Sequence, residues 1–375
     1  MAEIHLKGLA HSYIGNPQIS SDYAIHEMDH VWQQGGAYAL LGPSGCGKST
    51  LLNLISGLIK PSHGSVLFDG VEVNNTSTQD RNIAQVFQFP VIYDSMTVYD
   101  NLAFPLRNMK VDRETIDKKV KEVAKTLDLT EILSRKANNL SADEKQKISM
   151  GRGLVRDDVS AILFDEPLTV IDPNLKWKLR RKLKQIHERY NITMVYVTHD
   201  QLEASTFANK IALMYEGKIV QFGTPRELFE EPNHTFVGFF IGSPGMNFIS
   251  VEKEIVDGQL VFSFDGINFP LSQEQSDLLD NAQSHNLKIG IRPEFIQLSR
   301  VEHPESLPCK IVHTEDLGTY KILTVEVGKQ QLKVRLGEDQ QTPQENAFVT
   351  FPHQWVKTYV DEYLVTPSTG DSNNE

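Results

Sequence analysis

The chain has 375 residues, of which 40% are hydrophobic and 23% are charged, and its formal net charge is −12. This length and composition predict an ordinary water-soluble protein of two or three domains. The negative charge argues against a general nucleic-acid binder, because phosphate backbones require clustered Lys and Arg. The sequence shows neither a bilayer-spanning apolar segment nor the pattern of a signal peptide, so we expect a cytoplasmic protein that can dock on a membrane protein.

The first strong motif is a phosphate-binding P-loop, read at its full spacing between an apolar strand at residues 37–41 and a helix at residues 50–56. Small residues let backbone N–H groups curl around phosphate oxygens, the lysine reaches the β- and γ-phosphates, and the serine offers its hydroxyl to Mg²⁺. The motif predicts binding of ATP or GTP. We assign the nucleotide contacts to Gly42, Ser44, Gly45, Cys46, Gly47, Lys48, Ser49 and Thr50.

Neither cysteine indicates a metal or redox site. Cys46 lies in the P-loop and Cys309 is remote from it in the sequence, so no disulfide framework or metal-ligand spacing is present. Cys46 therefore reads as a small packing residue of the loop rather than as a nucleophile.

Up to residue 240, short apolar runs alternate with helical patterns, which is typical of a parallel sheet covered by helices. The sequence predicts strands at residues 83–87, 161–164, 193–197 and 210–214. Between about residues 91 and 156 the pattern becomes helical, most clearly at 113–127. We expect a nucleotide domain at 1–240 that contains a helical subdomain at 91–156.

Two predicted strands end in polar residues suited to phosphate chemistry. Asp165 and Glu166 follow the strand at 161–164, where Asp165 can serve a Mg²⁺ ion and Glu166 a water molecule. His199 follows the strand at 193–197, at the edge where open α/β sheets bind ligands. A buried strand ending in a solvated turn would explain the two acids equally well if they stood alone, but a neighbouring P-loop favours a catalytic role.

The remainder of the chain changes character. Breaker residues at 242–246 precede short alternating segments such as 260–264 and 332–336, which predict a small β-rich domain at 241–366. The polar end, residues 367–375, is predicted to be a disordered tail.

In this order the motifs resemble the ATP-binding subunit of an ABC importer with a C-terminal TOBE domain. The resemblance covers nearly the whole chain and implies a P-loop α/β nucleotide domain with a helical subdomain. It also implies an all-β OB-like domain after it, which the segment at 289–294 indicates. It implies that Tyr13 stacks on adenine, although a tyrosine that lies in a strand turn and has no role in nucleotide binding would explain this residue equally well. It also implies that Gln88 contacts the metal and the attacking water, that His199 contacts the γ-phosphate, and that Asp172 acts across a dimer interface.

The chain departs from the family at the signature Leu-Ser-Gly-Gly-Gln, where it has Leu140, Ser141, Ala142, Asp143 and Glu144. In the family this segment faces the γ-phosphate held by the other subunit. A carboxylate about 5 Å from a phosphate charge costs on the order of 3 kcal/mol at an effective dielectric near 20, unless it points away. The same residues also form a capping box, Ser141-x-x-Glu144, with acids that favour a helix N-terminus. We therefore assign Ser141, Asp143 and Asp172 to the dimer interface, with an impaired signature.

An impaired signature favours a heterodimer with a second ATPase over a homodimer, although homodimers are the commoner assemblies. The segments at 88–100, 140–147 and 241–246 resemble one of the two ATPases of bacterial glycerol importers. The resemblance implies ATP and Mg²⁺ as cofactors, permease subunits and a substrate-binding protein as partners, and a place on the inner face of the cell membrane. Glycerol 3-phosphate or a sugar carried by a homodimeric ATPase, a regulatory ABC ATPase without transport, and a soluble ATPase of the translation or repair type are the alternatives.

Overall fold

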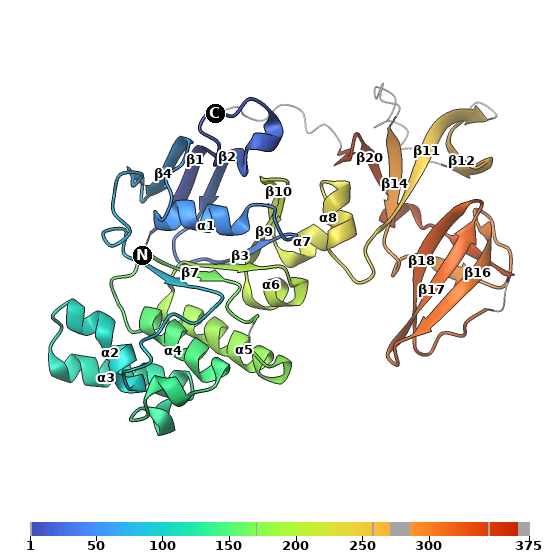
Figure 1. Cartoon of the computed structure of the whole chain (residues 1–375). Coiled ribbons are helices and arrows are strands. Elements are labelled where there is room, and N and C mark those ends of the chain that lie inside the picture. Colours follow the sequence, from blue (N-terminus) through green and yellow to red (C-terminus); the bar gives the residue numbers. More distant parts are fainter. Residues whose placement is uncertain (1, 170, 257–258, 271–285, 344–345, 367–375) are drawn as a thin grey trace. The chain divides into compact units, whose positions relative to one another are not determined.

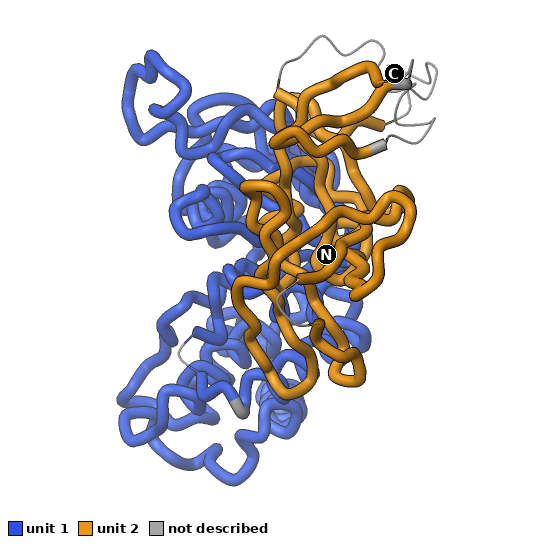
Figure 2. Tube along the Cα trace, turned by 90° about the vertical axis from the view of Figure 1, so that its right-hand side faces the viewer, with its two compact units in different colours: residues 1–225 blue, residues 226–375 orange. Residues whose placement is uncertain are grey.

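The computed structural model describes the chain except for residues 1, 170, 257–258, 271–285, 344–345 and 367–375 (Figure 1). The predicted disordered tail thus lies outside the described residues. The chain divides into two compact units, Met1–Pro225 and Arg226–Glu375 (Figure 2). Helix α8 (Thr235–Phe240) and nearly all of α7 (Pro225–Glu230) group with the second unit, whereas the sequence analysis placed both in the first domain.

The first unit is built on a mostly parallel sheet of order β10-β9-β3-β8-β7-β6. Its strands are β3 (Ala37–Leu41), β6 (Ile83–Val86), β7 (Ala161–Asp165), β8 (Met194–Thr198), β9 (Lys210–Tyr215) and the antiparallel β10 (Lys218–Gly223). Every residue of β3 and β8 is buried, which explains why these strands are continuous apolar runs. The strands predicted from the sequence are confirmed to within a residue or two at each end.

Among the helices of this unit, one contacts β7 of the central sheet, one contacts β3 and β8, and a third contacts the second of these helices. In that order they are α1 (Lys48–Ser56), α6 (Gln201–Phe207) and α5 (Pro173–Tyr190) (Figure 1). In α5 the buried residues Leu179, Leu183 and Ile186 recur at helical spacing, so one side of the helix is apolar and the other carries charge.

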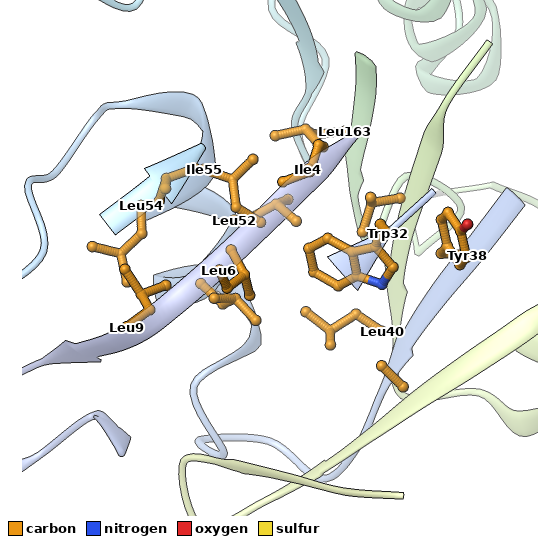
Figure 3. Close-up of a cluster of buried hydrophobic side chains, with 14 of the residues drawn as sticks. Ile4, Leu6, Leu9, Trp32, Tyr38, Leu40, Leu52, Leu54, Ile55 and Leu163 are labelled. Atoms are coloured by element: carbon orange, nitrogen blue, oxygen red, sulfur yellow. The ribbon is translucent and has the colours of Figure 1, made fainter. Parts of the chain in front are cut away.

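The first unit also contains an antiparallel sheet that the sequence analysis did not predict. Its order is β2-β1-β4-β5, formed by Ile4–His11 (β1), Ile25–Trp32 (β2), His63–Phe68 (β4) and Val71–Glu72 (β5). Side chains from this sheet, such as Leu6 and Trp32, share one buried cluster with Leu40 of β3 and with Leu52 and Leu54 of α1 (Figure 3). The P-loop helix is therefore anchored in the core shared by two sheets.

The helical region consists of α2 (Val98–Asn108), α3 (Arg113–Thr126) and α4 (Ala142–Leu154), with short 3₁₀ turns at Thr130–Ile132 and Ala137–Asn139; a further 3₁₀ turn, Ser20–Asp22, follows β1. Capping residues determine where two of these helices begin. The side chains of Thr97 and Asp112 cap α2 and α3 by accepting hydrogen bonds from the backbone N–H groups of Asp100 and Thr115. No helix in the described part of the chain has the length and hydropathy needed to span a bilayer.

The second unit is rich in antiparallel strands, as predicted, and forms sheets of order β13-β12-β11-β14-β20-β21 and β15-β19-β16-β17-β18. The strands are β11 (Asn247–Val256), β12 (Gln259–Phe264), β13 (Ile267–Pro270), β14 (Leu287–Ile291), β15 (Gln297–Ser299), β16 (Leu307–Asp316), β17 (Tyr320–Val327), β18 (Gln330–Gly337), β19 (Asn346–Thr350), β20 (Lys357–Val360) and β21 (Tyr363–Leu364), with a 3₁₀ turn at His353–Trp355. Burial in β18 alternates residue by residue, with Leu332, Val334 and Leu336 in the core.

A buried arginine joins helices α7 and α8 to the strands of the second unit. Arg292 is 1% exposed and donates to the carbonyl oxygens of Phe229 at 2.6 Å, of Leu228 and Gly238 at 3.4 Å, and of Ile241. Its guanidinium lies 3.9 Å from the centre of the Phe229 ring, and burial lowers the pKa of Arg292 to about 10. The carbonyl groups of Leu228, Phe229 and Ile241 lie at the ends of short helices, where acceptors lack intrahelical partners, and the guanidinium supplies their hydrogen bonds. The carbonyl oxygen of Gly238 also accepts from the Met246 N–H at 2.9 Å.

Candidate nucleotide site

The P-loop follows β3 and leads into α1, and glycines let its backbone take shapes that other residues resist. Gly47 has φ +101° and precedes the first residue of α1, and a Cβ there would lie 2.7 Å from the carbonyl oxygen of Ala24. At Gly42 a Cβ would lie 2.3 Å from the carbonyl oxygen of Met214. Side chains at these positions would force the loop to shift. Ser44 and Gly45 are exposed at the tip of the loop.

Lys48 is buried within the loop, at 5% exposure. Its Nζ donates to the carbonyl oxygens of Gly42 and Pro43, both at 2.8 Å, and lies 3.9 Å from Cys46 Sγ. The ammonium is thus held by loop oxygens in the curve where phosphate groups bind in P-loop proteins. Burial raises the pKa of the Cys46 thiol, which favours the packing role predicted for this residue.

The start of α1 meets the end of β7 at a pair of oxygen ligands. Ser49 Oγ donates to Asp165 Oδ1 at 3.1 Å. Burial raises the pKa of Asp165, against the effect of the Ser49 bond, and the neighbouring Glu166 carboxylate raises it further. A hydroxyl and a carboxylate at this separation are the donors that Mg²⁺ prefers, and such an ion would favour the ionised carboxylate.

Glu166 and His199, which lie far apart in the sequence, are brought together by the parallel pairing of β7 with β8. Glu166 Oε1 lies 3.2 Å from His199 Nδ1, and its Oε2 accepts from Thr169 Oγ1 at 3.4 Å. The backbone of Glu166 has φ +45°, an uncommon value for a non-glycine residue, and its N–H donates to the carbonyl oxygen of Val197 at 3.1 Å. The pair combines a carboxylate able to accept a proton with a largely exposed imidazole.

Tyr13 and Thr50 define the side of the site where a base would bind. The tyrosine is 66% exposed, and its hydroxyl lies 3.1 Å from Thr50 Oγ1. The ring packs edge-on against His11, with centroids 4.8 Å apart. An exposed ring held beside the P-loop helix is suited to stacking on adenine.

Gln88 stands at the end of the neighbouring strand. It follows β6, whose Val86 pairs with Phe164 of β7, so the two strand ends that lead to Gln88 and Asp165 are adjacent. The preceding residue is fixed by Gln146 of α4, which is fully buried and donates from Nε2 to the carbonyl oxygen of Phe87 at 2.9 Å. Sequence reasoning missed Gln146, although a glutamine within an otherwise apolar helix face is a signal of such a contact.

The signature segment forms the capping box that its spacing predicts. Ser141 Oγ accepts the backbone N–H of Glu144 at 3.3 Å, while Glu144 Oε2 accepts from the Ser141 N–H at 2.8 Å and lies 3.1 Å from its hydroxyl. Asp143 pairs with Lys147 at 2.8 Å, and both side chains are only 17% exposed. The Asp143 carboxylate is therefore compensated within the chain, which reduces the repulsion that the sequence analysis attributed to it. Asp172 is exposed just before α5, and its carbonyl oxygen accepts from Leu175 and Lys176.

The geometry defines a P-loop ATPase of the ATP-binding cassette class. A family model for ABC transporters matches residues 25–169, one for the MalK OB fold domain matches 242–296, and one for the TOBE domain matches 289–354. The chain belongs to the ABC transporter family, and it is an ATP-hydrolysing subunit coupled to transport.

Curated relatives match along most of the chain. It is 39% identical over 368 residues to the multiple sugar-binding transport ATP-binding protein MsmK of Streptococcus mutans, covering 94% of this chain and 96% of the relative. It is 37% identical to the sn-glycerol-3-phosphate import ATP-binding protein UgpC of Bordetella avium, covering 89% of each. The UgpC protein of Vibrio cholerae is 41% identical over 300 residues, which span 80% of this chain and 78% of the relative.

Two solved structures match about three fifths of the chain. One is cbiO1 from Clostridium perfringens, part of the transporter complex cbiONQ, with a TM-score of 0.55 and 26% identity over 61% of this chain and 90% of that one. Another is the dimeric ATP-binding cassette MJ0796 in a post-hydrolysis state with ADP and Pi, with a TM-score of 0.53 and 28% identity over 59% of this chain and 98% of that one.

Proposed function

We propose that this chain energises glycerol import as one of two different ATPase subunits of an ABC importer. Its relatives are named for the import of sugars and of sn-glycerol 3-phosphate, which supports a small polyhydroxy cargo. The similarity of its signature and neighbouring segments to glycerol importer ATPases narrows the proposal to glycerol. The subunit would lie at the inner face of the cell membrane, bound to two permease subunits. A substrate-binding protein would deliver the cargo to these permeases.

Within the site, each residue has a defined task in ATP hydrolysis. Lys48 is already oriented by the loop carbonyls, so it can turn to the β- and γ-phosphates without leaving the loop. Glu166 accepts a proton from the attacking water, and His199, held at 3.2 Å from it, donates toward the γ-phosphate. Tyr13 provides the stacking face for adenine.

Magnesium is the cofactor that the donor set fits. Ser49 Oγ, Asp165 Oδ1 and the amide of Gln88 are oxygen ligands for a hard cation. Among the described residues no three His, Cys, Asp or Glu side chains gather as a metal site, so phosphate oxygens and water would complete the coordination. The ion would neutralise charge on the β- and γ-phosphates.

The signature segment, through its capping box and its two missing glycines, carries the proposal of a second, different ATPase. The serine that would meet a γ-phosphate across the dimer has its hydroxyl and its N–H engaged by Glu144 of the same chain. The two glycines that would bring backbone N–H groups close to phosphate are Ala142 and Asp143. A partner with an ordinary signature would complete the P-loop of this chain, whereas two copies of this chain would lack a good signature in both sites.

A surface next to Gln88 supports docking on a membrane protein. Phe89, Val91 and Tyr93 are 69%, 54% and 40% exposed, and exposed apolar side chains that cluster can mark a protein interaction site. Arg152 of α4 donates to the carbonyl oxygen of Val91 at 2.6 Å and lies 4.8 Å from the Tyr93 ring. A permease segment bound here would be connected through Arg152 to α4, the helix that begins at the signature segment, and through Gln88 to the nucleotide.

Purified assemblies test the heterodimer. We expect slow ATP hydrolysis from the permeases with this chain alone and normal rates once the second ATPase is added. Glu166→Gln in this chain should trap an ATP-bound closed complex, and Lys48→Ala should abolish nucleotide binding at its P-loop; Lys178→Ala, at an exposed position on α5, is the matched control. Normal family rates from the chain and permeases alone would contradict the heterodimer.

Uptake in a strain that lacks this gene tests the cargo. We expect loss of labelled glycerol uptake, with restoration by the wild-type gene and not by the Glu166→Gln variant. If uptake of sn-glycerol 3-phosphate or of a sugar is lost while glycerol uptake is unchanged, the glycerol assignment is wrong, although the importer class stands.

A further inference from the structure

A buried carboxylate lies directly beneath the turn that carries His199. Glu203 of α6 is 4% exposed, and it accepts from the hydroxyls of Tyr196 at 3.1 Å and Thr198 at 3.0 Å through the same oxygen, Oε2. Its other oxygen, Oε1, lies 3.4 Å from Lys176 Nζ. An ionised carboxylate out of water requires such donors, and here three of them come from two elements besides its own helix.

The hydrogen bonds continue from Glu203 to both neighbours of His199. Thr198 Oγ1, which donates to Glu203, accepts the backbone N–H of Asp200 at 3.0 Å. The Asp200 carboxylate in turn accepts the N–H groups of Leu202 at 2.7 Å and Glu203 at 3.1 Å, and so caps α6. The residues before and after His199 are thus fixed by one network, while the imidazole itself extends toward Glu166.

The same carboxylate reaches the helix that follows Asp172. Lys176 lies in the first turns of α5, and its backbone N–H donates to the carbonyl oxygen of Asp172 at 3.1 Å. Burial, followed by the nearby Glu203 charge, raises the pKa of Tyr196 well above its ordinary value, so the tyrosine stays a hydroxyl donor. Arg180, also on α5, acts in the opposite direction on that tyrosine.

We propose that Glu203 is a positioning residue for ATP hydrolysis: its carboxylate holds the peptide units on both sides of His199 and ties them to the first turns of α5. Through this contact the placement of His199 beside Glu166 depends on the position of the start of α5 and of the Asp172 segment that leads into it. The inference concerns the hydrolytic step, and it does not depend on the cargo or on the identity of the second ATPase.

Glu203→Gln tests the proposal in the assembled transporter. The amide keeps the size of the side chain but loses the charge and places an NH₂ group among donors. We expect kcat for ATP hydrolysis to fall about tenfold, as loss of a charged hydrogen bond implies, with the KM for ATP changed less than about twofold. Glu188→Gln, at an exposed position on α5, is the matched control and should change neither value.

A second background separates positioning from a general loss of structure. Single-turnover hydrolysis is measured for Glu203→Gln with and without His199→Ala. If Glu203 acts through His199, Glu203→Gln lowers the single-turnover rate much less in the His199→Ala background than in the wild-type background. An equal fold loss of rate in both backgrounds overturns the proposal. Should Glu203→Gln not fold, Thr198→Val replaces it in the same cycle, and Thr198→Ser must restore the rate. A serine variant as slow as the valine variant also overturns the proposal.

Discussion

His30 makes the stability of the first unit depend on pH. The residue lies in β2, its ring packs edge-on against Trp32 and Phe222 with centroids 5.1 and 4.5 Å apart, and Nε2 has no hydrogen-bond partner among the described residues. Burial lowers the pKa of His30 from 6.5 to about 4. The folded chain therefore keeps the ring neutral at pH 5, whereas the unfolded chain protonates it. The stabilisation is fully present above pH 6.5 and is lost as the pH falls from 6.5 toward 4.

These two pKa values fix the size of the effect. One pKa unit corresponds to about 1.4 kcal/mol, so the linkage relation gives a loss of about 2 kcal/mol between pH 7.5 and 5 and about 3 kcal/mol below pH 4. His30→Phe keeps an aromatic ring between Trp32 and Phe222 and removes the titrating group. In urea unfolding of the full chain at pH 7.5 and 5, the variant should lose about 2 kcal/mol less than the wild type.

Other titrating groups, including His11 and His26, whose pKa values are also lowered first by burial, are present in both proteins and cancel in this difference. His63→Phe, at an exposed position of β4, controls for the introduction of a phenylalanine. An equal loss of stability in wild type and His30→Phe would refute the reasoning.

Three further substitutions test the contacts described above. Tyr13→Ala should raise the KM for ATP up to about tenfold while Tyr13→Phe, which keeps the ring, should not; unchanged affinity in the alanine variant contradicts adenine stacking. Arg292→Met leaves buried carbonyl oxygens without donors and should lower the stability of the second unit by about 3 kcal/mol, measured by urea unfolding; a loss under about 1 kcal/mol contradicts this account. Gln146→Ala frees the carbonyl oxygen of Phe87 and should lower kcat about tenfold at an unchanged KM for ATP; an effect on KM alone would show that Gln146 acts on nucleotide binding instead.

The parts of the fold that could be predicted are those in which a local pattern is sufficient. The parallel strands are continuous apolar runs because both of their faces are covered, and the P-loop has its own spacing, so both are visible in the sequence. The antiparallel sheet of β1, β2, β4 and β5 was missed because its register shifts break the alternation of polar and apolar residues.

For the candidate site, the sequence predicted residues but not the contacts between them. Asp165, Glu166 and His199 stand out because each follows a buried strand, and parallel pairing then brings the strand ends together. Glu203 did not stand out, because a glutamate in the first turn of a helix is expected as an exposed residue that complements the helix dipole. Its burial arises from Tyr196 and Lys176, which belong to different elements, and such a meeting is set by tertiary packing alone.

The signature helix shows how a stabilising local structure can conflict with a role in catalysis. A capping box satisfies donors that a helix N-terminus otherwise presents to an anion, and in α4 it takes up both the hydroxyl and the N–H of Ser141. For a γ-phosphate to use the same serine, the Glu144 carboxylate would first have to leave, at a cost of about 1 kcal/mol in helix stability. That cost alone is too small to abolish a nucleotide site formed by the P-loop of one subunit and the signature of another. The absence of the two signature glycines must therefore account for much of any impairment of hydrolysis. Asp143 contributes less than its charge suggests, because Lys147 already neutralises it.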